Sequence, residues 1–125
     1  MVHYQFENDL SDSTGNGNTG TINVGGSETY VSGIDNQAFD LNGLTHIETS
    51  DTPFDFERDD SFSFSTWIKT DVQGVSESIF GKFTSGKGIN VFLKSSDDQL
   101  RVRISNSNSD KIVVCLLYTS DAADD

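Results

Sequence analysis

The stretch Ser61-Phe62-Ser63-Phe64-Ser65-Thr66-Trp67-Ile68-Lys69 alternates apolar and polar side chains over most of its length. Phe62, Phe64 and Ile68 are separated by even numbers of positions and would lie on one face of a strand. Trp67 is the one large apolar residue that would lie on the opposite, polar face. Alternation with a period of two predicts a β-strand that has one buried face. Burying each phenylalanine side chain stabilises a fold by roughly 1.5–3 kcal/mol. We therefore expect a second apolar surface to cover the face formed by Phe62 and Phe64.

Short runs of the same kind recur on both sides of this stretch. No segment shows helical periodicity, and turn-forming residues recur about every 8–12 positions, as in two-sheet β proteins. The pattern predicts an all-β fold, an antiparallel two-sheet sandwich. In addition to residues 61–69, the expected strands are Val2–Phe6, Thr21–Val24, Thr29–Val31, Phe39–Leu41, Leu44–Glu48, Ser78–Phe83, Ile89–Lys94, Leu100–Ile104 and Ile112–Val114.

Two of the expected strands make specific predictions about side chains. Phe39 and Leu41 share one parity of their strand and are expected to point inward. In the strand from Leu100 to Ile104, aliphatic residues alternate with Arg101 and Arg103, which predicts one apolar face and one solvated face. The segment Thr49–Asp60 holds the single proline and an acidic cluster, which is typical of a surface connection.

Two other stretches resemble a known family. Tyr4–Gly20 places an aromatic pair ahead of a glycine- and asparagine-rich loop, and Gly33–Gly43 reads as a glycine turn followed by an alternating strand. Together with residues 61–69 they resemble the laminin-G-like and pentraxin-like jelly rolls of the concanavalin A-like lectin and glucanase superfamily. Asn36 stands where that family usually has glycine, but asparagine tolerates the left-handed backbone, so we expect the turn to persist. The resemblance implies a jelly-roll sandwich.

The last eleven residues have a different character. Cys115–Asp125 resembles, codon by codon, the translation of a transposase library adapter used in DNA sequencing. We interpret residues 115–125 as a non-native tail and residues 1–114 as a laminin-G-like domain, a metagenomic fragment that is incomplete at its C-terminus. The closing strands would then be missing, so we expect Phe62, Phe64 and Ile68 to be covered less than a core requires. The one cysteine belongs to the tail, which leaves no disulfide framework or thiolate metal site.

The composition excludes several classes of protein. Eight Lys and Arg residues stand against 20 Asp and Glu, which gives a net charge of -12. An acidic surface argues against partners that are nucleic acids or anionic membranes. No apolar run approaches the roughly 20 residues of a membrane span. The resemblance implies an extracellular or cell-surface location, in a larger bacterial protein whose other domains are partners of this one.

The glucanases of the superfamily use a Glu-x-Asp-x-x-Glu strand, whose two glutamates serve as nucleophile and acid/base. The nearest match begins at Glu57 and Asp59, and it places Phe62 where the second glutamate belongs. His3 and His46 are isolated, and no Gly-x-Ser-x-Gly nucleophile elbow is present. The sequence predicts a protein that is not an enzyme.

A calcium site is a second possibility. Asp12, Thr14 and Asn16 place oxygen-bearing side chains at alternate positions before Gly17, as in the first half of a calcium loop. The twelfth position of that count is Asn23 rather than the bidentate glutamate of a complete loop. The resemblance implies one structural calcium at the sandwich edge, with Asp9 and Asp12 as candidate ligands. The alternative is that both carboxylates cap turns by accepting backbone amides.

Trp67 is the candidate ligand-binding residue, because an indole on the polar parity can serve as a platform for a sugar ring. The alternative is that Trp67 lies under a neighbouring loop. Domains of the family that bind different ligands tend to carry tryptophan at this position, which favours this packing role. Arg101 and Arg103 are expected to be solvated cations. The leading interpretation is a non-catalytic recognition module that binds carbohydrate or glycan. The alternatives are an accessory fragment of a polysaccharide-degrading enzyme and a structural or adhesion spacer.

Overall fold

The structure, a computed structural model, describes residues 1–55, 60–70, 74–84, 87–97, 99–106 and 109–114. In these residues the strands are all antiparallel and the helical content is one 3-10 turn, η1 (Thr52–Phe54), at the proline of the predicted surface connection. The prediction of an all-β fold is confirmed. The chain divides into two units, Met1–Trp67 and Ile68–Asp125, and the division falls inside the predicted central strand.

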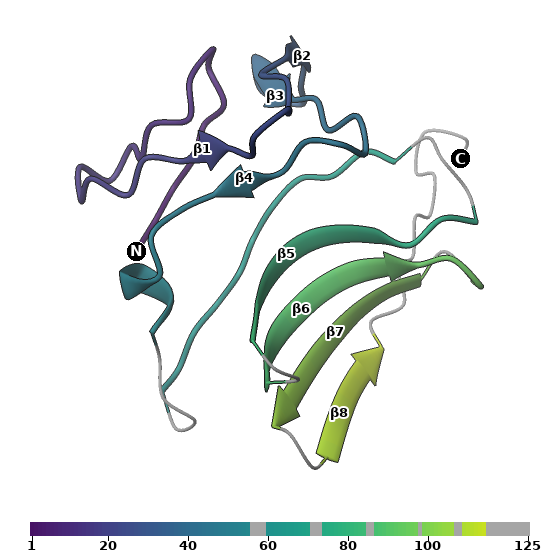
Figure 1. Cartoon of the computed structure of the whole chain (residues 1–125). Coiled ribbons are helices and arrows are strands. Elements are labelled where there is room, and N and C mark those ends of the chain that lie inside the picture. The colour runs from purple at the N-terminus through teal and green to yellow at the C-terminus, as the bar shows by residue number, and fades with distance from the viewer. Residues whose placement is uncertain (56–59, 71–73, 85–86, 98, 107–108, 115–125) are drawn as a thin grey trace, which may run out of the picture. The chain divides into compact units, whose positions relative to one another are not determined.

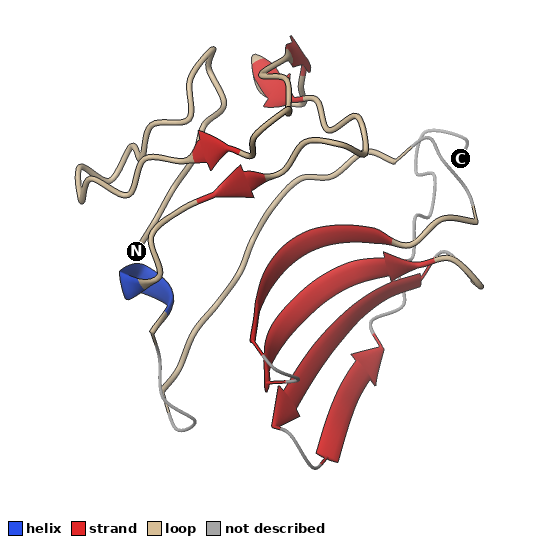
Figure 2. Cartoon of the chain, viewed as in Figure 1, coloured by secondary structure: helices blue, strands red, loops and turns tan. Residues whose placement is uncertain are grey.

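The first unit contains short strands joined by long loops (Figure 2). Strand β1 (Thr21–Ile22) pairs with β4 (Ile47–Glu48), and β2 (Tyr30–Ser32) pairs with β3 (Gln37–Phe39). The predicted first strand is wrong in extent, because residues 2–6 contribute only an isolated bridge between Tyr4 and Asp12. Strand-like alternation is present there, but the chain turns away at Phe6 and Asn8, which both adopt a φ of 60°.

The hairpin β2–β3 closes on a tight turn. The Gly33 amide donates to the Asn36 carbonyl oxygen at 2.9 Å, and Asn36 adopts a φ of 55°. Asparagine thus holds the left-handed position that was expected to accept it, and that prediction is confirmed. A Cβ at Gly33 would lie 2.7 Å from the Gln37 carbonyl oxygen, so the other end of the turn requires glycine.

A row of half-buried aromatic rings packs together in the first unit. Tyr4 stacks on Phe6 at 6.0 Å between ring centroids, Phe6 lies 5.9 Å from Phe39, and the edge of Tyr30 meets Phe39 at 5.5 Å. Such aromatic pairs contribute about 0.5–1.5 kcal/mol each beyond the area that they bury. The inward position predicted for Phe39 is confirmed.

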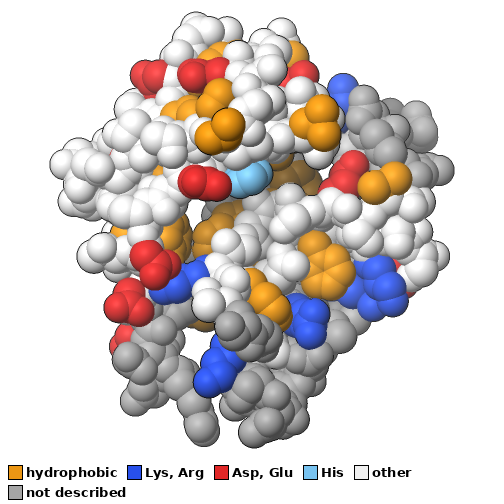
Figure 3. All heavy atoms as spheres, viewed as in Figure 1, with side chains coloured by type: hydrophobic (Ala, Val, Ile, Leu, Met, Phe, Trp, Pro, Cys, Tyr) orange, Lys and Arg blue, Asp and Glu red, His pale blue; other side chains and the backbone are white. Residues whose placement is uncertain are grey.

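Several aliphatic side chains of the same unit remain at the surface. Leu41, which was predicted to point inward, is 53% exposed, and Leu44 is 77% exposed. Both residues lie outside the strands, because β3 ends at Phe39 and β4 begins only at Ile47. Alternation therefore does not continue to Leu41, and the prediction for that residue is wrong. Figure 3 shows apolar side chains at the surface of the face in view.

The second unit contains a four-stranded antiparallel meander (Figure 1). Its strands follow chain order as β5 (Glu77–Thr84), β6 (Lys87–Lys94), β7 (Gln99–Asn106) and β8 (Ser109–Val114). All four were predicted within a few residues of these bounds. Burial alternates along β6, where Ile89, Val91 and Leu93 are buried and the residues between them are only half-buried.

The two faces of β7 differ from expectation. Leu100, Val102 and Ile104 stand opposite the buried residues of β6, as predicted for an apolar face, yet Ile104 remains 43% exposed. Arg101 and Arg103 were expected to be solvated, but both are half-buried. This expectation is wrong, because Arg101 forms an ion pair with Asp97 and Arg103 lies over the Phe83 ring.

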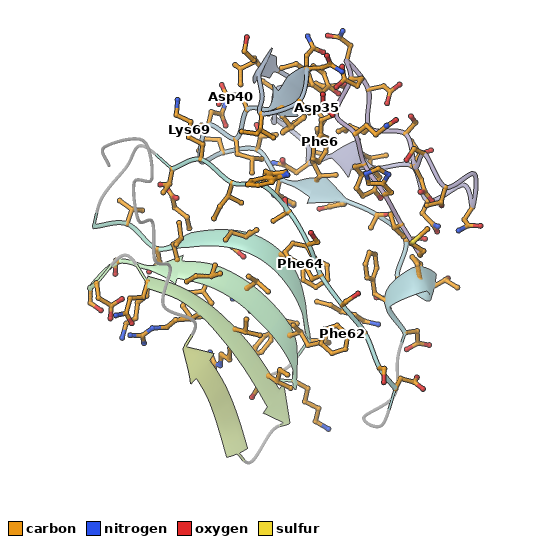
Figure 4. The ribbon with its side chains drawn as sticks, turned by 180° about the vertical axis from the view of Figure 1, so that it is seen from behind. Phe6, Asp35, Asp40, Phe62, Phe64 and Lys69 are labelled. Atoms are coloured by element: carbon orange, nitrogen blue, oxygen red, sulfur yellow. The ribbon has the colours of Figure 1, made fainter. Side chains whose placement is uncertain are left out.

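Residues 61–69 form no strand in the structure. They run as a loop, on which Phe62, Phe64 and Lys69 are labelled in Figure 4. Every residue of this loop is exposed, and the exposed fractions of Phe62, Phe64 and Ile68 are 46%, 44% and 42%. The predicted central strand is therefore wrong, whereas the expected shortage of cover over these three side chains is confirmed. Alternation specifies which side chains share a face, but a strand also requires a hydrogen-bonded neighbour. Residues 115–125 lie outside the described residues.

Candidate functional site

Trp67 is exposed over 82% of its surface. Trp67 is therefore not packed under a neighbouring loop, although the resemblance to the family favoured that position. The indole is accessible, as a sugar platform requires. The chain near it is held locally by the Thr66 hydroxyl, which donates to the Trp67 carbonyl oxygen at 3.3 Å. A flat, exposed ring offers an apolar face and an N–H donor at its edge, the combination that suits the mixed surface of a sugar.

The opening loop is built around the carboxylate of Asp12, which is buried although it is charged. Oxygen Oδ1 accepts hydrogen bonds from the His3 amide at 3.1 Å, the Thr14 amide at 3.1 Å and the Thr14 hydroxyl at 2.7 Å. Oxygen Oδ2 accepts from the Asn18 amide at 3.4 Å and the Asn18 side-chain nitrogen at 3.0 Å. Five donors thus converge on one side chain from three places in the loop.

These contacts have a clear electrostatic consequence. The Thr14 hydroxyl lowers the pKa of Asp12, burial opposes that effect, and the His3, Asn18 and Thr14 donors add to it, so that the pKa lies well below its ordinary value. Hydrogen bonds to the ionised form favour that form. Asp12 is therefore a fixed anion at neutral pH.

Asp12 in this arrangement does not fit a calcium ligand, because hydrogens from its donors are directed at both oxygens. A coordinating carboxylate must direct its lone pairs at the ion. Within the described ranges no group of three or more His, Cys, Asp or Glu residues is placed to hold a metal. The geometry instead fits the turn-capping alternative that the sequence left open.

Asp9 makes simpler contacts. Its Oδ1 accepts the Ser11 hydroxyl at 2.6 Å and the Ser11 amide at 3.0 Å, which is a local turn. The Ser11 hydroxyl and then its amide lower the pKa of Asp9, although the carboxylate is exposed. The second candidate ligand thus also has a structural role in the loop.

Asn18 was not singled out by the sequence, yet it connects the opening loop to the chain that follows β4. Its carbonyl oxygen accepts the Tyr4 hydroxyl at 2.5 Å and the Thr49 hydroxyl at 3.2 Å, and the Ser50 hydroxyl donates to its Oδ1 at 3.3 Å. The signal that could have indicated it was the Asn-rich composition of the loop, since asparagine both donates and accepts.

Both arginines of β7 have side-chain partners. Arg101 Nη2 lies 2.6 Å from Asp97 Oδ2, and the Arg103 guanidinium carbon lies 5.3 Å from the centre of the Phe83 ring. Burial raises the pKa of Asp97, but the Gln99 amide and the charge of Arg101 outweigh burial and lower it overall. Both arginines therefore have partners within the second unit, and these contacts give them a structural role.

Each of the two histidines has a side-chain partner within the described residues. His46 Nε2 lies 2.8 Å from Glu48 Oε1 at an exposed position, and His3 Nδ1 lies 2.8 Å from the Ser13 hydroxyl oxygen. Glu57 and Asp59, the nearest match to the glucanase strand, lie outside the described residues.

No protein-family model, curated protein or solved structure matches this chain significantly. Among the helices of the described part, none is long and apolar enough to cross a membrane.

Proposed function

We propose that this chain is a non-catalytic carbohydrate-recognition module of the laminin-G-like jelly-roll type, from a secreted or surface-attached bacterial protein, and that Trp67 contributes the binding platform. The single observation that carries the proposal is the 82% exposure of that indole. Exposing a tryptophan forgoes the stabilisation of burying a large apolar surface, so a role in contact with a ligand gives a physical reason for it.

Three further features support the proposal. The fold is all-β and antiparallel, as a jelly roll requires. The surface is acidic, so a neutral polymer is a better partner than a polyanion. The Tyr4–Gly20 and Gly33–Gly43 stretches resemble the same family as residues 61–69.

The test uses the chain's single tryptophan, because selectively excited fluorescence then reports on Trp67 alone. We expect a saturable change in emission when soluble neutral oligosaccharides are titrated into the 125-residue chain. Isothermal calorimetry on Trp67→Ala should show affinity reduced by about tenfold or more, which corresponds to about 1.4 kcal/mol. Trp67→Phe should retain part of the affinity, because a smaller ring still stacks.

The matched control is Ile34→Ala, which removes another exposed apolar side chain, 75% exposed, from the hairpin turn. Its affinity should equal that of the parent chain. Unchanged binding by Trp67→Ala would remove the indole from the site. Failure of every oligosaccharide to bind would instead support the structural or adhesion spacer.

The absence of catalysis is tested in the same incubations. We expect no release of reducing sugar from common β-glucans, because the two-carboxylate arrangement of a glucanase is not encoded. Release that Glu57→Ala or Asp59→Ala abolished would contradict this part of the proposal.

A further inference from the structure

Asp12 gathers the opening loop from inside. Its five donors come from His3, Thr14 and Asn18, so one carboxylate joins the start, the middle and the end of a sixteen-residue stretch. A calcium ion orders a loop by collecting oxygen ligands around a positive charge. Here the polarity is reversed, because a negative charge collects N–H and O–H donors.

The anchored loop is also tied to a distant part of its own unit. The Asn18 carbonyl oxygen accepts the Tyr4 and Thr49 hydroxyls, and the bridge between Tyr4 and Asp12 adds a backbone connection. The Ser13 amide donates to the His3 carbonyl oxygen at 2.8 Å, beside the Asp12 contacts. Asn18 thus bonds both to Asp12 in the loop and to Thr49 after β4. The order that Asp12 imposes on the loop therefore extends to the residues after β4.

A cation would have to compete with these donors. An ion at Oδ1 would compete with the amides of His3 and Thr14, and an ion at Oδ2 would compete with the two Asn18 nitrogens. Donors that lose their partner cost free energy. At the other candidate ligand, Asp9, the Oδ1 oxygen already accepts the amide and the hydroxyl of Ser11. The balance favours the internal donors.

We propose that Asp12 is a permanent intramolecular anchor that orders the opening loop without calcium, in contrast to what the resemblance to calcium-holding jelly rolls implies. The role concerns the loop alone and does not depend on carbohydrate binding at Trp67.

The experiment is amide hydrogen exchange followed by nuclear magnetic resonance on the 125-residue chain, with excess calcium chloride or with chelator. The amides of His3, Thr14 and Asn18 should be protected equally in both conditions. In Asp12→Ala their protection should fall by about tenfold or more, because local opening no longer breaks charge-assisted hydrogen bonds. Asp9→Ala is the control, and in it these three amides should keep their protection.

Two results would overturn the proposal. The first is a saturable calcium-dependent change at Thr14 or Asn18 that both Asp9→Ala and Asp12→Ala abolish, because that pattern defines a calcium site. The second is full protection in Asp12→Ala without calcium. If Asp12→Ala does not fold, Asp12→Asn decides, since it retains one acceptor oxygen and should show intermediate protection, whereas unchanged protection in it would contradict the anchor.

Discussion

Asn23 extends the β1–β4 pair with its side chain. Its Oδ1 accepts the His46 amide at 2.7 Å, its backbone amide donates to the His46 carbonyl oxygen at 3.2 Å, and its Nδ2 donates to the Leu44 carbonyl oxygen at 3.0 Å. The residue that stands at the twelfth position of the calcium-loop count thus pairs with backbone. It continues the ladder one position beyond Ile22 and Ile47.

Replacing Asn23 by alanine should destabilise the first unit by about 0.5–1.5 kcal/mol, because the hydrogen bonds to the exposed His46 amide and Leu44 carbonyl are exchanged for bonds to water. Asn23→Asp keeps the acceptor for His46 but loses the donor to Leu44. Its stability should therefore lie between that of the parent chain and that of Asn23→Ala. Urea unfolding followed by circular dichroism measures the difference. A midpoint that Asn23→Ala leaves unchanged would contradict this role.

The stability of the chain should depend on pH through Asp12. Its pKa in the folded chain is lowered, so the unfolded chain takes up the proton first as pH falls. The stabilisation is complete above the ordinary value of 3.8 and is lost progressively as pH falls below that value. The contribution of Asp12 to the free energy of unfolding should therefore be nearly constant from neutral pH down to about pH 4 and decline below it.

Asp12→Asn, which does not titrate, isolates that contribution. Its stability should decline less steeply at acid pH than that of the parent chain. Asp9→Asn is the comparison, because Asp9 also has a lowered pKa but lies at the surface and accepts hydrogen bonds from Ser11. Identical acid profiles for Asp12→Asn and the parent would show that Asp12 does not supply the dependence.

The β5–β8 sheet depends on the buried face of β6. Leu93 is 5% exposed, and Leu93→Ala should cost about 2–5 kcal/mol through lost burial and the cavity left behind. Leu44→Ala is the matched control at 77% exposure and should change stability by no more than about 0.5 kcal/mol. If Leu93→Ala does not fold, Ile89→Val should still report a loss of about 0.5–1.5 kcal/mol by urea unfolding. Equal losses in Leu93→Ala and Leu44→Ala would contradict a core on this face.

Gly88 occupies a position in β6 that other residues cannot adopt without strain. Its φ is 135°, and a Cβ there would collide with the Lys82 carbonyl oxygen. Gly88→Ala should therefore destabilise the β5–β6 hairpin by about 1–3 kcal/mol. Gly81→Ala is the control in the neighbouring strand, because its nearest contact would be the Asn90 side-chain oxygen at an ordinary 3.5 Å. The midpoint temperature of thermal unfolding should fall in Gly88→Ala but not in Gly81→Ala. Equal midpoints in the two variants would refute the steric argument.

The sequence by itself determined the features that depend on near neighbours along the chain. Alternation and turn residues predicted β5 to β8 because a hairpin pairs segments only a few residues apart. The Asn36 turn was predictable for the same reason, since its conformation follows from one residue's tolerance of positive φ. Asp12 and Trp67 were singled out as candidate residues from their residue types and positions in the pattern.

The tertiary structure decided everything that depends on partners distant in the chain. Residues 61–69 have the alternation of a strand, yet their state depends on a hydrogen-bonding neighbour that periodicity does not specify. Trp67 is exposed rather than packed, because burial is set by what surrounds a residue and not by its parity. The role of Asp12 became clear only when folding brought His3 and Asn18 to its two oxygens, since a carboxylate can bind a cation or accept hydrogen bonds and its neighbours in space select between them.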